Sequence, residues 1–329
     1  MKKNSKQKIK PGKKPKAKKV KALVLLSGGL DSRLACRIMQ EQAGKDNIEA
    51  LLFLLPFGEG CCADKYCVFR FCQKEGIKLR VIDCTKGKLL QEYMELIRSP
   101  RYGYGAGINP CIDCRIFMFS KAKEIMEKEG FDVIATGEVI GERPMSQRKK
   151  AMDIIENKSG LKGKLLRPLS AKLLPETELE KSKLLDRERF FDIHGRQRKK
   201  QIELAKKYKI DYPSPAGGCL LCEKELTDRI KTFLENEDKI SEEDIKLLKI
   251  GRQFHNGKII LGRNEKENKE IELIAKEAKG ILLIPQQPGP SAFVKEIKGK
   301  KNNKELIDKA KELIQKYSKH EIKDIKAVK

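Results

Sequence analysis

From residue 22 to about residue 138, the chain alternates short apolar runs with stretches of helical periodicity. Four apolar runs predict β-strands, at residues 23–26, 48–55, 79–83 and 133–136. Apolar positions spaced three and four apart predict four helices, at residues 33–42, 65–75, 88–97 and 117–128. Strands separated by helices are typical of an α/β fold, a parallel sheet with helices on both faces. In such a sheet, ligands bind at the carboxyl ends of the strands.

The rest of the chain follows two other patterns. Residues 141–213 are charged and carry few strand signals, and helices are predicted at 176–186, 194–208, 223–235 and 241–248. Beyond residue 248, His255, Asn256 and Gly257 separate two apolar runs, and Asn-Gly is a strong hairpin signal. The same region predicts helices at 265–278 and 303–317 and strands at 281–284 and 291–296. This pattern favours a small C-terminal α+β domain.

These patterns divide the chain into four parts. They are a Lys-rich tail at 1–21, a nucleotide-binding α/β domain at 22–222, a helical linker at 223–247 and an α+β domain at 248–325. The tail contains eleven lysines and no acidic residue, so we expect it to be disordered and solvated.

The net charge of the chain indicates which class of molecule it binds. The chain has 72 Lys and Arg against 47 Asp and Glu, a formal net charge of +25, which favours a polyanion such as nucleic acid. No apolar run approaches the roughly 20 residues that a membrane-spanning helix needs. Residues 1–21 contain no apolar core of a secretory signal. A cytoplasmic protein without a membrane partner is therefore expected, and its ten cysteines favour metal, cluster or redox chemistry over disulfides.

A glycine turn joins the first predicted strand to the first predicted helix. Residues 27–32 read SGGLDS. Gly28 and Gly29 let successive N–H groups point at a phosphate, and the start of the following helix adds positive potential. Ser27 and Ser32 can donate their hydroxyls, and Asp31 suits Mg²⁺.

This string resembles the SGGxDS signature of the PP-loop ATP pyrophosphatases. The resemblance implies that ATP and Mg²⁺ bind over the turn and that a substrate oxygen is adenylated with release of pyrophosphate. It assigns a catalytic role to Asp31 and nucleotide binding to Ser27, Gly28, Gly29, Asp31 and Ser32.

Two CxxC pairs are the second chemical signal. Cys111 and Cys114 form the first pair, and Cys219 and Cys222 form the second, about 100 residues later. Each pair follows a turn that contains Gly or Pro, an arrangement typical of metal ligands. Three interpretations remain open from the residues: a [4Fe–4S] cluster, a structural Zn²⁺ site, and a persulfide or disulfide redox pair.

Several stretches resemble tRNA thiolation enzymes. Residues 109–114 and 216–220 resemble the NPDxxCN and STGICF stretches of the bacterial tRNA 2-thiouridylases, with Cys114 and Cys219 on the two functional cysteines. Cys111 stands where that family has Asp. Residues 135–147 and 166–170 resemble the TGExxGQxxSQT and LRPL stretches of the tRNA 4-thiouridine synthetases. This resemblance implies that Gly137 and Glu138 contact the adenylate.

The resemblance also implies a mechanism. Many members of these families hold a [4Fe–4S] cluster with three protein ligands, and the matching residues are Cys111, Cys114 and Cys219. Cys222 has no counterpart, so it could be an alternative ligand, a persulfide carrier or a fourth zinc ligand. The resemblance implies catalytic roles for Cys114 and Cys219, and Cys222 is a further catalytic candidate as the persulfide carrier. The implied function is ATP-dependent thiolation of a tRNA uridine, with sulfur from hydrosulfide or from a persulfide or sulfur-carrier protein, and with a homodimer considered.

Two other functions compete with this one. A zinc-stabilised RNA-binding protein could keep the nucleotide fold without catalysis. Another PP-loop enzyme that amidates or ligates RNA is the third interpretation, and its chemistry does not need two CxxC pairs.

The other cysteines and the C-terminal part add weaker signals. Cys36 and Cys84 are expected in the core. A further group is expected to be small packing residues, with a second metal site as the alternative: Cys61, Cys62, Cys67 and Cys72. Residues 257–264, Asn268 and 288–294 resemble the NFACT-R domain, which implies RNA or ribosome binding, with Arg263 and Asn264 as donors.

Overall fold

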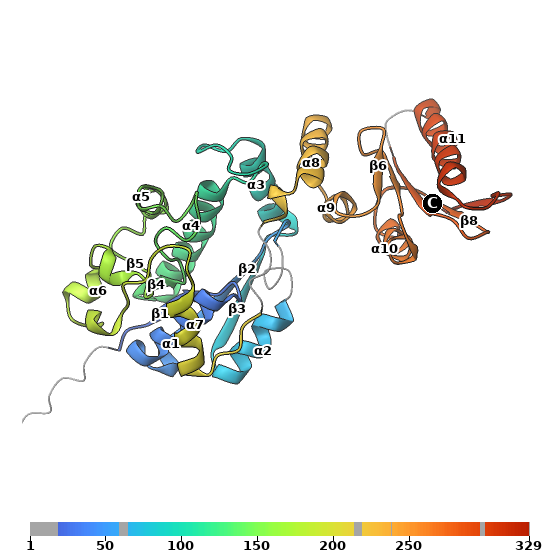
Figure 1. Cartoon of the computed structure of the whole chain (residues 1–329). Helices are drawn as coiled ribbons and strands as arrows, with labels where there is room; N and C mark the ends of the chain where they lie inside the picture. The colour runs from blue at the N-terminus through green and yellow to red at the C-terminus, as the bar shows by residue number, and fades with distance from the viewer. Residues whose placement is uncertain (1–18, 59–64, 214–218, 238, 297–299, 329) are drawn as a thin grey trace, which may run out of the picture.

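The structure, a computed structural model, describes residues 19–58, 65–213, 219–237, 239–296 and 300–328. Most of the predicted Lys-rich tail lies outside the described residues, as do Cys61 and Cys62. Two sheets lie at opposite ends of the molecule, with two helices between them (Figure 1).

The first sheet confirms the predicted α/β fold. Its strands are parallel and run in the order β3-β2-β1-β4-β5. Their bounds are β1 Ala22–Leu25, β2 Ile48–Leu54, β3 Lys78–Asp83, β4 Val133–Thr136 and β5 Leu165–Leu166. The strand order reverses at β1, which pairs with β2 on one side and β4 on the other. A ligand crevice is therefore expected at the carboxyl ends of β1 and β4.

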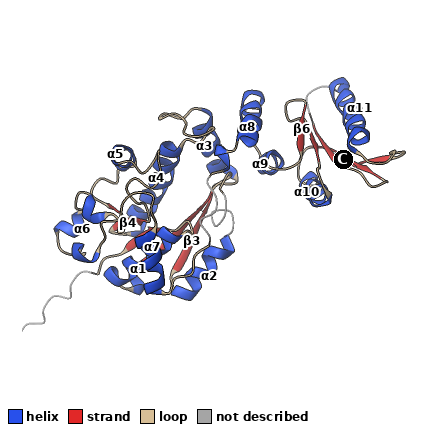
Figure 2. Cartoon of the chain, viewed as in Figure 1, coloured by secondary structure: helices blue, strands red, loops and turns tan. Residues whose placement is uncertain are grey.

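Helices cover both faces of this sheet because successive strand side chains point to opposite sides. The helices are α1 Leu30–Ala43, α2 Lys65–Glu75, α3 Gly87–Arg98, α4 Cys111–Glu129, α5 Lys149–Lys158 and α7 Lys199–Tyr208. Val24 and its equivalents pack against α1, α2 and α7. Leu23 and its equivalents pack against α4 and α5. Figure 2 shows this arrangement of strands between layers of helix.

Some predicted boundaries were wrong. Helix α4 begins at Cys111, six residues before the predicted start, and α7 begins at Lys199 instead of 194. Helix α5 and strand β5 were not predicted at all. The start of α4 carries no simple apolar stripe because it faces two apolar clusters at once, and Cys114 and Phe117 pack against both. A helix contacted on several sides gives a weak periodic signal.

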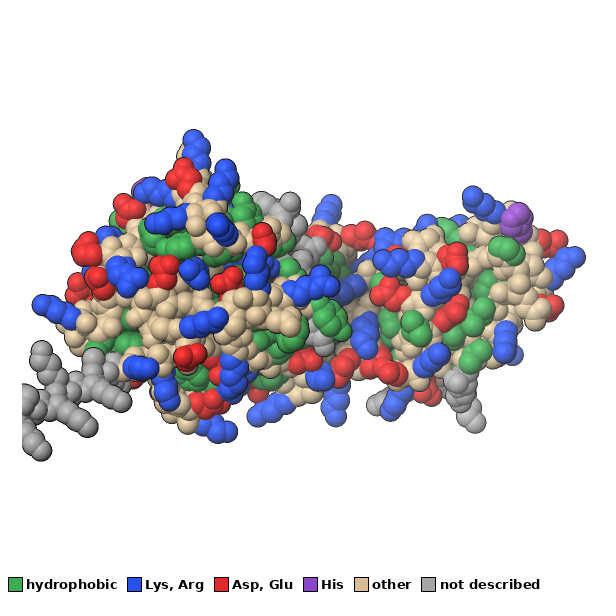
Figure 3. Space-filling model, turned by 90° about the horizontal axis from the view of Figure 1, so that it is seen from below, with side chains coloured by type: hydrophobic (Ala, Val, Ile, Leu, Met, Phe, Trp, Pro, Cys, Tyr) green, Lys and Arg blue, Asp and Glu red, His purple; other side chains and the backbone are tan. Residues whose placement is uncertain are grey.

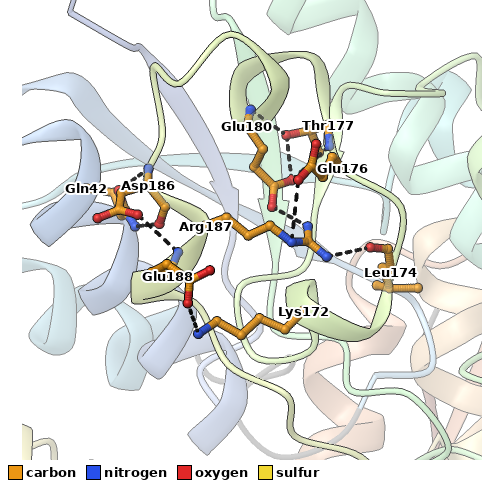
Figure 4. A network of polar contacts seen from close by, with 9 residues as sticks. All are labelled: Gln42, Lys172, Leu174, Glu176, Thr177, Glu180, Asp186, Arg187 and Glu188. Atoms are coloured by element: carbon orange, nitrogen blue, oxygen red, sulfur yellow. Dashed lines mark hydrogen bonds and ion pairs between the residues drawn. The ribbon is translucent and has the colours of Figure 1, made fainter.

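The prediction of a helix at 176–186 was wrong. Within this segment the α-helix is only one turn long, α6, Glu178–Lys181. Thr177 and Glu180 form a capping box that starts it, and Lys183 adopts a left-handed φ of 57° just after it ends. Arg187 then donates to the Glu180 carboxylate at 2.7 Å and to the Leu174 carbonyl at 2.8 Å. This polar network, shown in Figure 4, orders the segment in place of a longer helix.

Two helices connect the sheets. Helix α8 spans Lys224–Asn236 and α9 spans Glu242–Leu248. Ile230 and Phe233 of α8 belong to the same apolar cluster as Leu90 and Ile97 of α3. The predicted linker is therefore packed against the first domain and is not an exposed spacer.

The C-terminal sheet is antiparallel, in the order β10-β8-β9-β7-β6. Its strands are β6 Arg252–Phe254, β7 Ile259–Leu261, β8 Gly280–Pro285, β9 Ala292–Lys295 and β10 Ile325–Val328, of which β10 was not predicted. Helices α10, Glu265–Ala275, and α11, Lys300–Tyr317, cover opposite faces. Val294 packs toward α11, and its neighbour Phe293 packs toward α10.

The polar residues of this domain act mainly within it. The predicted hairpin is present, with left-handed φ at His255, Asn256 and Gly257. Arg263 bonds the Glu267 carboxylate, and the Asn264 side chain accepts from the Glu267 N–H as the cap of α10. These contacts hold both side chains within the domain, and their predicted role as donors to RNA stays a prediction.

The surface does not concentrate its positive charge on the face shown in Figure 3. Lys and Arg side chains are spread over both parts of the molecule in this view, with acidic side chains between them. Within the described ranges, none of the helices has the length and apolar character needed to cross a membrane.

Candidate functional site

The predicted phosphate turn lies at the carboxyl end of β1 and leads into α1. Gly28 has a φ of 85°, a left-handed conformation that favours glycine. Gly29 occupies the N-cap of α1 and provides no side chain to the free N–H groups of the first turn. The Ser27 hydroxyl donates to that of Ser32 at 3.2 Å, and the Ser32 hydroxyl donates to the Gly29 carbonyl at 2.9 Å. The turn has the shape and the open donors of an anion site.

Gly137 lies against this turn. A Cβ added there would lie 2.5 Å from the Asp31 carbonyl carbon and 2.5 Å from the Ser32 nitrogen. Because both neighbours are backbone atoms, a larger residue would push the turn out of place. The end of β4 therefore forms one wall of the site, where Gly137 was predicted to lie.

Glu138 is enclosed between two arginines. Its side chain is 3% exposed, and the Arg167 Nε donates to its Oε2 at 3.1 Å. The Arg115 Nε lies 3.6 Å from its Oε1. Glu138 was predicted to contact the adenylate, but this geometry first gives it the role of orienting Arg115 and Arg167.

The surroundings of Asp31 shift the pKa of its carboxyl group. Burial and the nearby Glu142 raise its pKa to about 6, while Arg198, Arg143 and Gln201 oppose the rise. Its Oδ1 is buried and makes no hydrogen bond within the described part of the chain. The Arg198 Nη2 donates to Glu142 at 2.6 Å, which ties α7 to this corner. A cation or a hydrogen-bond donor of a ligand would give this buried Oδ1 the partner that the described residues do not supply.

Sequence reasoning missed Glu142, Arg198 and Gln201. Gln201 is fully buried on the face of α7 that also carries Ala205, which packs in the core. A polar residue within the apolar stripe of a helix was the signal that could have revealed it.

We predict that the protein free of nucleotide and metal loses stability between about pH 4 and about pH 6. In this window the folded state holds the Asp31 proton and the unfolded state has released it. Stability should therefore fall as pH rises, by up to about 3 kcal/mol at roughly 1.4 kcal/mol per pH unit. Urea unfolding at several pH values would measure this, and Asp31→Asn should remove that part of the slope and be the more stable protein at pH 7. Equal slopes for the two proteins would contradict the prediction.

The structure brings the two CxxC pairs together. Asn109 joins them, because its Oδ1 accepts from the Cys111 thiol and its Nδ2 donates to the Cys222 sulfur, both at 3.1 Å. The Ile108 N–H also donates to the Leu221 carbonyl at 3.0 Å. Residues about 110 positions apart thus share one corner, as the predicted constellation requires.

Burial keeps the thiols of Cys111, Cys114 and Cys219 in their neutral form. Burial, together with the other three cysteines of the two pairs, raises the pKa of Cys219 to about 12. Burial also raises the pKa of Cys111 and of Cys114, while Arg115 opposes both rises. The Tyr93 hydroxyl lies 3.5 Å from the Cys114 sulfur. A bound cation would reverse this preference and favour the thiolates.

Four thiols in one corner have the donor chemistry of a zinc or iron–sulfur centre. Among the described residues, however, no three His, Cys, Asp or Glu side chains surround a single point as ligands of one ion. The donor set therefore fits such a group, and the positions of the sulfur atoms would have to adjust to hold it.

Two arginines connect the phosphate turn with the cysteines. Arg143 lies close enough to both Asp31 and Cys111 to oppose the pKa rise of each. Arg115 contacts Glu138, which follows Gly137, and opposes the pKa rise of Cys111. The turn and the thiols therefore belong to one charged edge of the sheet.

The remaining cysteines divide into core and contact residues. Cys36, Cys72 and Cys84 are at most 1% exposed, which confirms that they pack in the core. Cys67 accepts a hydrogen bond from Arg33 at 3.0 Å.

Comparison with known proteins gives a family match and more distant relatives. Residues 20–200 match the family described as the tRNA methyl transferase HUP domain. A protein of Methanosarcina mazei, named probable tRNA sulfurtransferase, is 30% identical over 125 residues, which are 37% of this chain and 29% of that protein. The chain thus spans less than a third of that relative's length.

Two solved structures have weaker similarity. The U34-tRNA thiolase NcsA from Methanococcus maripaludis, solved with its [4Fe–4S] cluster, is 19% identical, with a TM-score of 0.36 over 69% of this chain and 70% of that one. The NH3-dependent NAD synthetase of Campylobacter jejuni, solved with a nitrate ion, is 14% identical, with a TM-score of 0.36 over 70% and 82%. Scores this low carry no argument about the activity of this chain.

Proposed function

This chain belongs to the family of the tRNA methyl transferase HUP domain, and from that premise we propose that it is an ATP-dependent tRNA uridine thiolase. The observation that carries the proposal is the meeting of the two CxxC pairs, together with Arg143, which acts both on Cys111 and on Asp31 of the phosphate turn at the switch point of the sheet. A phosphate turn with clustered thiols suits sulfur transfer better than the methyl transfer in the family's description. The name of the Methanosarcina relative agrees with this choice.

The first step uses the phosphate turn. With ATP and Mg²⁺ bound there, the carbonyl oxygen of a uridine attacks the α-phosphorus, and pyrophosphate leaves. The N–H groups of the turn and of the first turn of α1 stabilise the charge on the phosphates. Ser27 and Ser32 add hydroxyl donors, Asp31 orders the metal, and Gly137 keeps the turn in place.

The second step uses the cysteines. A sulfur nucleophile attacks the activated carbon of the base, and AMP leaves with the former carbonyl oxygen. Hydrosulfide is the sulfur donor that we propose. The alternative is a persulfide delivered by a carrier protein: after its outer sulfur bonds to the base, a cysteine thiol breaks the S–S bond and forms a disulfide, which a thiol reductant then reopens. Cys111, Cys114 and Cys219 would hold a [4Fe–4S] cluster, which would supply a site that binds the incoming sulfur. With Cys222 as a fourth ligand, the same corner would alternatively hold Zn²⁺. Arg115 would favour thiolates among these residues.

The C-terminal domain completes the proposal. Its resemblance to NFACT-R and its antiparallel sheet suit a second contact with the tRNA. The domain limits that we propose follow the sequence: a tail at 1–21, the thiolation domain at 22–222, helices at 223–247 and the RNA-binding domain at 248–325. A cytoplasmic homodimer is the proposed state in the cell.

Two measurements test the proposed function. Nucleosides of tRNA from a deletion strain, analysed by mass spectrometry, should lack one thiolated uridine, and the gene should restore it. Protein purified without oxygen should contain iron and acid-labile sulfide. Stoichiometric zinc, together with an unchanged set of tRNA nucleosides, would favour the zinc-stabilised RNA-binding protein instead.

A further inference from the structure

One buried arginine donates a hydrogen bond to a backbone carbonyl of the phosphate turn. Arg33 lies in the first turns of α1 and is 5% exposed, which is rare for an arginine without close partners. Its Nε donates to the Gly28 carbonyl at 2.6 Å, and its Nη1 donates to the Asp211 carbonyl at 2.6 Å. Its Nη2 donates to the Cys67 sulfur at 3.0 Å. One planar guanidinium thus joins the turn to two other segments.

The bond to Gly28 matters because of peptide geometry. A trans peptide is planar, so the Gly28 carbonyl and the Gly29 N–H point in opposite directions. Gly28 is a glycine at a φ of 85°, where the backbone has little intrinsic preference for either orientation of the following peptide. By holding the carbonyl on the side of α2, Arg33 fixes the Gly29 N–H on the opposite side.

The guanidinium is itself held by rigid elements. It lies 4.9 Å from the centre of the Phe71 ring, and Phe71 and Cys67 both belong to α2. Asp211 follows α7, the helix that carries Gln201. Arg33 is therefore fixed by the helices on both sides of α1, as a support of an anion site should be.

We propose that Arg33 is a positioning residue that sets the orientation of the Gly28–Gly29 peptide and so aims the Gly29 N–H at the phosphates of ATP. The inference rests on the proposed function, because it presumes that the turn binds ATP. It adds a residue outside the SGGLDS string, together with its anchors Cys67 and Asp211.

The test is ATP affinity, measured by calorimetry with ATP and Mg²⁺ on the full chain. Arg33→Ala should weaken binding about 10- to 100-fold, the effect of losing charge-assisted hydrogen bonds at a buried site. A cavity of about 600 Å³ is lined by Arg33, Cys67, Phe71 and Asp211 among others, so methylguanidinium can reach the vacated position. Added methylguanidinium should restore part of the affinity. Arg33→Lys should stay weakened, because an ammonium lacks the planar fork.

A matched control lies one turn further along α1. Arg37 makes ion pairs with Glu41 at 3.6 Å and Glu75 at 3.7 Å. Arg37→Ala should therefore change ATP affinity less than about twofold. Binding of tRNA without ATP should be the same for all of these variants.

If Arg33→Ala does not fold, two substitutions of Cys67 test the same proposal with a smaller change. Cys67→Ser keeps an acceptor for the Arg33 Nη2 and should bind ATP like the parent. Cys67→Ala removes that acceptor and should weaken ATP binding by roughly threefold to tenfold.

The outcomes separate this inference from the proposed function. If the unaltered protein does not bind ATP, the proposed function and the inference both fail. If it binds ATP and Arg33→Ala, or Cys67→Ala in its place, binds ATP equally well, the inference alone fails. Lower thermal stability with unchanged ATP affinity and no effect of methylguanidinium would also overturn it, since Arg33 would then be only structural.

Discussion

Asp31→Asn should abolish the release of pyrophosphate and AMP from ATP in the presence of tRNA. The Asp31 carboxylate lies within the phosphate turn, and its buried Oδ1 has no partner among the described residues, so it is free to order a cation there. The amide has the same shape but no charge, so the metal that neutralises the phosphates is lost. We expect a decrease of roughly 10³-fold or more, as for the loss of electrostatic stabilisation at a reacting phosphate.

Radiolabelled ATP and chromatography of the products would measure this. Asp83→Asn is a suitable control, since Asp83 ends β3 of the same sheet and accepts hydrogen bonds from Thr85. That variant should keep its activity. Because Asp31→Asn should also be the more stable protein at pH 7, inactivity could not be attributed to unfolding. Full activity of Asp31→Asn would contradict the proposed role of the phosphate turn in ATP cleavage.

Cys114→Ala and Cys219→Ala should each stop thiolation while the transfer of the α-phosphate from ATP to tRNA continues. The phosphate turn and the thiols are formed by different segments, which Arg143 and Arg115 connect. Removing one thiol therefore leaves the groups that bind ATP in place. The thiolated nucleoside should decrease by roughly 100-fold or more, whereas pyrophosphate release should stay within a few-fold of the parent.

Cys84→Ala separates this effect from the loss of any buried thiol. Cys84 is completely buried at the end of β3 and close to Cys114, but it belongs to neither pair. Its replacement should lower stability by about 1 kcal/mol and leave the thiolated product in place. If pyrophosphate release disappeared together with thiolation in Cys114→Ala, the role of Cys114 would be structural.

Most of the fold was predictable because its signals are local. Strands β1, β2 and β4 are short runs of mainly apolar residues, and α2 begins and ends where the spacing of its apolar residues predicts. The segment at 176–186 could not be predicted, because its structure depends on Arg187 reaching back to Glu180 and Leu174. Strand β10 pairs with β8 across about 40 residues, and the sequence carries no local sign of that pairing.

The candidate site also has a part that the sequence predicts and a part that it does not. The string at 27–32 and the spacing within each CxxC pair are local patterns, so the sequence by itself determined that a phosphate turn and two thiol pairs exist. Only the tertiary structure decided that Asn109 joins Cys111 to Cys222, that Glu142 raises the pKa of Asp31, and that Arg33 holds the Gly28 carbonyl. The Asn109–Cys222 and Asp31–Glu142 contacts join segments far apart in the chain, and Arg33 reaches Gly28 while it is held by the distant Asp211 and Cys67. They exist because the parallel sheet gathers the ends of its strands at one edge, an arrangement that depends on strand order and not on any single segment.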